Sequence, residues 1–140
     1  MTTSSRTATQ AYAHVGLETG VAAASQKKLI LMLYDGAELA VRMAITHTHA
    51  GELTSKSAAI TKAMNIILEG LRAALDMEKG GDLAIQLAAL YDYMNARLLH
   101  GHVNNEVTPL EEVLALLREL HSAWKQIPDQ SALQPIAHAA

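Results

Sequence analysis

Apolar residues recur every three or four positions along most of this 140-residue chain, and four segments carry the pattern. They run over about 26–49, 53–77, 82–101 and 108–127. This spacing places the apolar side chains of each segment on one side of an α-helix. Four helices of similar length with short connections favour an all-α fold, an antiparallel up-down four-helix bundle.

Residues with strong positional preferences mark the helix ends. Ser25 is a suitable N-cap for the first helix, and Gly51 marks the turn that follows it. Gly80 and Gly81 stop the second helix, and Pro109 sits where a first helical turn accepts proline. Pro128 ends the fourth helix.

Composition divides the chain into three parts. Residues 1–24 are mostly small, lack a helical period and predict a flexible or short-helical N-terminal segment. Residues 25–127 form the predicted bundle, and residues 128–140 a frayed C-terminal tail.

Each predicted helix has one apolar stripe that we assign to the core. In chain order, the stripes are Leu29, Leu33, Ala37, Ala40 and Ala44; Ile60, Met64, Ile67, Leu71 and Leu75; Leu83, Leu87, Leu90, Met94 and Leu98; and Leu110, Val113, Leu114, Leu117, Leu120 and Trp124.

The first and third helices are apolar on more than one side. The six apolar residues 29–34 wrap most of the way round a helix, so part of the run must lie outside the core. The far sides hold Leu31, Tyr34, Asp35, Glu38, Arg42 and Ile45 on the first helix, and Ile85, Ala89, Asp92 and Ala96, flanked by Tyr91 and Tyr93, on the third.

Two occupants suit such surplus surface. The N-terminal segment can fold over it, or an amphipathic helix of another protein can bind there. The two possibilities are compatible if the N-terminal segment covers this surface until a partner displaces it. The candidate partner-binding residues are Leu31, Tyr34, Ile45, Ile85, Ala89, Asp92 and Tyr93.

Composition narrows the function classes. The net charge of −3 argues against a nucleic-acid partner, and the absence of cysteine excludes a disulfide scaffold. The longest apolar runs are too short to cross a bilayer, and the first 25 residues do not resemble a signal peptide. We therefore expect a cytoplasmic protein without membrane insertion.

The seven histidines invite a metal hypothesis, which the spacing disfavours. Metal sites in helix bundles use Glu-x-x-His pairs on facing helices, and the chain has none. His47 and His49, like His100 and His102, are two residues apart and read as solvated histidines near turns. Without a nucleophile motif or a phosphate loop, we expect no catalytic residues, metal or cofactor.

Several segments together resemble the FliS family of flagellin export chaperones. They include Gln-Ala-Tyr-Ala at 10–13, Leu-Met-Leu-Tyr-Asp-Gly-Ala at 31–37, Leu-Asp-Met-Glu-Lys-Gly-Gly-Asp-Leu-Ala at 75–84, Leu-Tyr-Asp-Tyr-Met at 90–94 and Ala-Trp-Lys at 123–125. The resemblance covers about residues 10–127 in order. The chain departs from the family at Gln26, where proline is frequent, and at Gln86, where asparagine is common.

The resemblance implies a function. Family members are antiparallel helical bundles that bind the disordered C-terminal region of flagellin, keep it from polymerising early and deliver it to the export gate. Tyr12 matches an N-terminal tyrosine that covers part of the flagellin groove in the free protein. A flagellar adaptor or regulator that binds an anti-sigma factor or an export-gate protein is the alternative, and an enzyme or metal bundle is a second.

Overall fold

The computed structural model describes residues 22–128, with side chains from Gln26 onwards. Its elements are α2 (Ala22–Ala50), α3 (Leu53–Asn65), a π-helical continuation η1 (Ile66–Arg72), α4 (Gly81–Asn104) and α5 (Thr108–Gln126). The predictions for residues 1–21 and 129–140, Tyr12 among them, lie outside the described residues.

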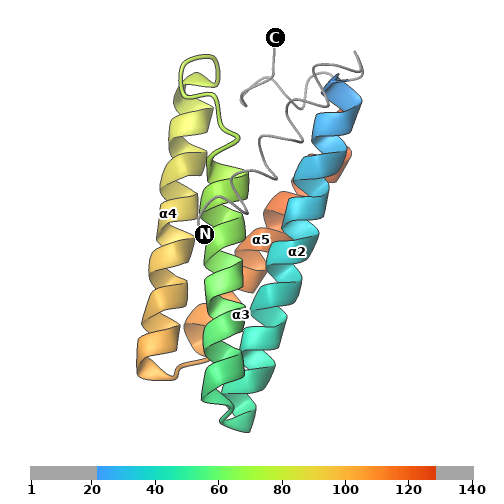
Figure 1. Cartoon of the computed structure of the whole chain (residues 1–140). Helices are drawn as coiled ribbons and strands as arrows, with labels where there is room; N and C mark the ends of the chain where they lie inside the picture. The colour runs from blue at the N-terminus through green and yellow to red at the C-terminus, as the bar shows by residue number, and fades with distance from the viewer. Residues whose placement is uncertain (1–21, 129–140) are drawn as a thin grey trace.

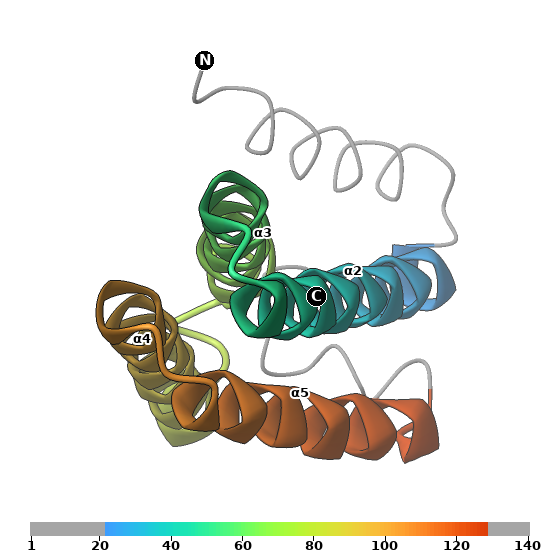
Figure 2. The ribbon, with the colours of Figure 1, turned by 90° about the horizontal axis from the view of Figure 1, so that it is seen from below.

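The helices alternate in direction, as Figure 1 shows by their colours. Seen along the bundle in Figure 2, they follow one another around a ring in the order α3, α2, α5, α4, and each contacts its two neighbours. The all-α bundle predicted from the sequence is confirmed, and α2 and α4 lie on its diagonal.

Two of the predicted helix ends are wrong. Helix α2 begins at Ala22, so Ser25 lies inside its first turns and is not the N-cap. The second helix changes to π geometry at Ile66 and ends at Arg72. The Asp76 carboxylate then accepts hydrogen bonds from the backbone N–H groups of Glu78 and Lys79, a local turn that competes with further helix.

The turns use the residues that tolerate left-handed backbone. Gly51 and Gly81 have φ values of +71° and +56°. Asn105, at φ 53°, ends α4, and its side-chain oxygen accepts from the buried Lys56 amine, which also donates to the His102 carbonyl. Lys56 thus caps α4 from α3, a role that the sequence did not reveal.

The core stripes of α3 and α5 are largely as predicted, whereas those of α2 and α4 are confirmed only in part. The residues buried as predicted are Ala37, Ala40 and Ala44 on α2 and Met94 and Leu98 on α4. On α2 the buried residues include Ile30, Tyr34 and Val41, while Leu29 and Leu33 are only half-buried. On α4, Leu83 was assigned to the core and is 51% exposed, whereas Tyr91 is buried.

A polar cluster in the core accounts for the burial of Tyr34 and Tyr91. The Tyr34 and Tyr91 hydroxyls are 2.6 Å apart and hydrogen-bonded. The Tyr34 ring stacks on His121 at 5.6 Å between centroids, and His121 Nδ1 lies 2.6 Å from Glu38 Oε2. Glu38 and His121 are both buried, which the sequence analysis did not predict. The cluster joins α2, α4 and α5.

Truncating the core at Leu117 should destabilise the protein far more than truncating Leu87. Leu117 is fully buried, so Leu117→Ala should cost about 2–5 kcal/mol of unfolding free energy. Leu87 is only half-buried against the core, and Leu87→Ala should cost clearly less. Urea unfolding measures both, and an equal loss would show that the assigned burial is wrong.

The buried tyrosine pair should make stability fall at high pH. Burial raises the pKa of Tyr91 from 10.0 to about 12 and raises that of Tyr34 as well. The unfolded chain then releases these protons first, so the stability from both groups is complete below about pH 10 and is lost as the pH rises towards about 12. Urea unfolding at about pH 9 and about pH 11 measures the loss.

The matched control is the double variant Tyr34→Phe, Tyr91→Phe, which has no hydroxyl to ionise at either position. Its stability should depend less on pH in this range than that of the parent. The same slope in both proteins would assign the loss to other groups.

Candidate partner-binding surface

The outer face of α4 carries one row of exposed side chains along its whole length. The row consists of Ile85, Ala89, Asp92, Ala96, Leu99 and Val103. The residues follow one another at alternating spacings of four and three, the pattern with which a helix meets a partner helix. At 1.5 Å per residue the row is about 27 Å long.

The row extends further than the sequence indicated. Ile85, Ala89, Asp92 and Ala96 lie on the outer face as predicted, with Ile85 at 55% exposure. Val103 was missed because the helix was predicted to end near Gly101, whereas α4 continues to Asn104. Leu99 lies within the predicted helix but was not assigned to this face. Val103 is 70% exposed.

Asp92 is the charged residue within this row, and Arg72 neutralises it. The Arg72 guanidinium donates two hydrogen bonds to the Asp92 carboxylate, at 2.8 and 3.1 Å. Both side chains are exposed, so the pair adds little to stability. Its consequence is that the middle of the row presents no uncompensated charge to a partner.

Tyr93 lies beside the row, at the edge between α4 and α5. Its hydroxyl donates to Glu112 Oε2 at 2.5 Å, and Arg97 donates to Glu112 Oε1 at 2.7 Å. The hydrogen bonds from Tyr93 and Arg97 lower the pKa of the Glu112 carboxyl. These contacts hold the exposed Tyr93 ring in one orientation next to the row.

The candidates on α2 are placed differently. Leu31 and Ile45 are half-buried against the core. Tyr34 is fully buried, so its predicted position on the outer face is wrong, because its hydroxyl is paired with Tyr91 inside the bundle. Among the described side chains of α2, the large apolar ones that are exposed are Met32, Leu39 and Met43.

The sequence analysis did not single out the face of α2 that carries Met32, Leu39 and Met43, because apolar residues occur on more than one side of this helix. Met43 borders a hollow of about 280 Å³ between α2 and α3, which Ala40, Ala59 and Lys62 also line.

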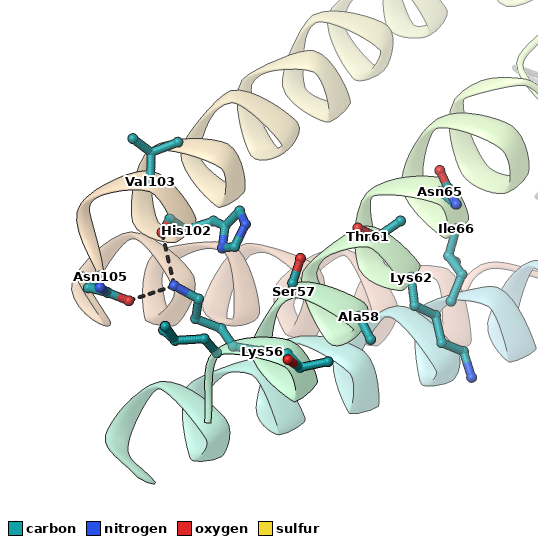
Figure 3. A pocket seen from close by; sticks show the side chains of 12 residues that line it. Lys56, Ser57, Ala58, Thr61, Lys62, Asn65, Ile66, His102, Val103 and Asn105 are labelled. Atoms are coloured by element: carbon teal, nitrogen blue, oxygen red, sulfur yellow. Dashed lines mark hydrogen bonds between the residues drawn. The ribbon is translucent and has the colours of Figure 1, made fainter. Parts of the chain in front are cut away.

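A larger hollow, of about 1160 Å³, runs over α3. Figure 3 shows Ser57, Thr61 and Asn65 on the side of α3 that faces α4, with His102 and Val103 at the end of α4 beside them. We call this part of the hollow the α3–α4 groove. Since Val103 belongs to the exposed row, the groove adjoins the row.

Residues 22–128 also bear on metal binding and on membrane insertion. No three His, Cys, Asp or Glu side chains in this range are placed to hold a metal ion. Nor does this part of the chain include a helix with the length and apolar character that crossing a bilayer requires.

Comparison with known proteins identifies a family and several relatives. The family model "Flagellar protein FliS" matches residues 8–131. The flagellar secretion chaperone FliS of Salmonella typhimurium is 45% identical over 125 residues, which are 89% of this chain and 93% of that protein. The Escherichia coli protein of the same name is 43% identical over 118 residues, 84% and 87% of the two chains.

A more distant relative has the same name. The flagellar secretion chaperone FliS of Bacillus subtilis is 30% identical over 109 residues, which cover 78% of this chain and 80% of that protein. With the family model matching nearly the whole chain, this protein belongs to the FliS family of flagellar secretion chaperones.

Proposed function

We propose that this protein is a cytosolic export chaperone for flagellin. It binds the disordered C-terminal region of flagellin, prevents premature polymerisation and delivers flagellin to the flagellar type III export gate. The observation that carries the proposal is the exposed, helix-spaced row on α4 in a chain of the FliS family.

The row suits a client that becomes helical on binding. Ala89 and Ala96 are small and let a second helix approach closely, while Ile85, Leu99 and Val103 supply apolar area beside them. Burial of apolar surface contributes about 25 cal/mol per Å². Ordering a disordered tail offsets part of this gain.

Because the cost of ordering the tail offsets part of the gain from apolar burial, the net affinity is moderate. A moderate affinity fits a chaperone that must release its client. A tail held in this way cannot make the contacts that it forms in a filament. Binding and prevention of polymerisation are then one event, and no catalytic step is needed.

The second exposed apolar face favours an additional partner. Met32, Leu39 and Met43 lie on α2, away from the α4 row, and methionine adapts to partners of different shape. An adaptor function, with an anti-sigma factor or an export-gate protein on this face, is the alternative. Separate binding assays with flagellin, anti-sigma factor and gate protein distinguish the two.

A charge in the middle of the row should weaken client binding. We expect Ala89→Lys to bind the isolated C-terminal region of flagellin at least about tenfold more weakly, because the ammonium group must lose water on entering the interface. Lysine is a good helix former, so the fold should persist. Isothermal titration measures the affinity and circular dichroism the fold.

The matched control is Ala115→Lys on α5, which is also an exposed alanine within a helix but lies among charged residues. Ala115→Lys should bind as the parent protein does. Equal affinity of the two folded variants would remove the α4 row from the proposed function.

A further inference from the structure

The ion pair between Arg72 and Asp92 stands in the middle of an otherwise apolar row. Asp92 is the third of the six row residues, and Ala89 and Ala96 lie about one helical turn to either side of it. Alanine is the smallest side chain of the row, so a second helix approaches α4 most closely here, to about 8 Å between the axes. A helix lying on the row therefore covers the pair.

Covering the pair removes water from two charged groups. In the free protein the side chains of Arg72 and Asp92 are 38% and 53% exposed. When water leaves, the desolvation cost can exceed the attraction between the charges unless their remaining hydrogen-bonding capacity is used. Each Asp92 oxygen accepts one hydrogen bond from Arg72 and can accept a second. A client side chain that donates to Asp92 replaces the lost water, and an aliphatic one does not.

An uncharged donor suits this position best. A cationic client side chain would be repelled by the Arg72 guanidinium, and an anionic one by the Asp92 carboxylate. Ser, Thr, Asn and Gln side chains each have a donor without a charge. Since the other five row residues are apolar, the pair singles out one position along the client helix.

The apolar part of the row does not single out a position in this way. Its residues are spaced alternately by four and three, so a client helix that slides by about seven residues presents an equivalent apolar stripe. In helical coiled coils, one polar group within an apolar interface selects a single register and lowers the stability of the others. The Arg72–Asp92 pair has the same setting on the α4 row.

We propose that the Arg72–Asp92 pair sets the register of the client helix on the α4 row. In this register an uncharged polar side chain of the client lies over Asp92, and client apolar side chains contact the rest of the row. Both oxygens of Asp92 are held by the Arg72 guanidinium, so the carboxylate has a fixed orientation before the client arrives. This inference rests on the proposed function, because the client is the flagellin tail.

The test compares removal of one charge with removal of both. The single variant is Asp92→Leu, and the double variant is Arg72→Leu, Asp92→Leu. The matched control is Glu111→Leu, Arg118→Leu, which replaces one acidic and one basic residue at exposed positions of α5, away from the row. Each protein is titrated with the C-terminal region of flagellin from its own organism, and circular dichroism confirms that each is folded.

The register is measured with a spin label beside the row. The chain has no cysteine, so Gln86→Cys, at an exposed position of α4, carries a single nitroxide in each protein. The label broadens the NMR signals of those residues of the isotope-labelled flagellin tail that lie near it. One broadened stretch of the tail means one register, and a second stretch about seven residues away means two.

Asp92→Leu should bind the tail at least about tenfold more weakly than the parent, because the client then covers an unpaired Arg72. The double variant should bind at least about fivefold more tightly than Asp92→Leu, since no charge remains to be covered. The parent and the α5 control should show one register and equal affinity. The double variant should show two registers.

Other results overturn the inference in distinguishable ways. One register in the double variant, or two in the α5 control, would show that the pair does not set the register. Parent-like affinity of Asp92→Leu would show that the client does not cover the pair, while sensitivity to Ala89→Lys would still support the proposed function. Equal weakening of the single and double variants would make the pair a source of affinity instead. If the parent binds no flagellin tail, both proposals fail.

Discussion

The hydrogen bond between the Tyr34 and Tyr91 hydroxyls determines how α2 and α4 are turned about their axes. These helices lie on the diagonal of the bundle, where few other contacts join them. Each hydroxyl would be costly to bury alone, so each helix must turn its tyrosine towards the other. Through the stacked His121 and its Glu38 partner, α5 is fixed to the same centre.

The exposed row on α4 is a consequence of this pairing. With Tyr91 inside the bundle, the row from Ile85 to Val103, which is centred about 120° round the helix from Tyr91, faces outwards. The same holds on α2, where burial of Tyr34 leaves Met32 and Leu39 exposed. A polar contact in the core thus controls which apolar side chains remain on the surface for a partner.

The sequence predicted the helices and their order well because the apolar period is clear and the turn residues are typical. It predicted the buried side of α5 correctly, since that helix has a charged face opposite Leu110 and Leu117. It oriented α2 and α4 only in part, because both carry apolar residues on more than one side and periodicity alone does not choose between those sides. The sequence also did not predict the burial of Tyr34, Lys56 and His121, because that burial depends on partners distant in the sequence.

The central claim is that the exposed surface of this bundle receives the C-terminal region of flagellin. Co-purification of this protein with intact flagellin and with flagellin lacking only that region tests the claim most directly. The account predicts a stable complex with intact flagellin and none with the truncated protein. Equal recovery of both would contradict it, because the binding site would then lie elsewhere on flagellin.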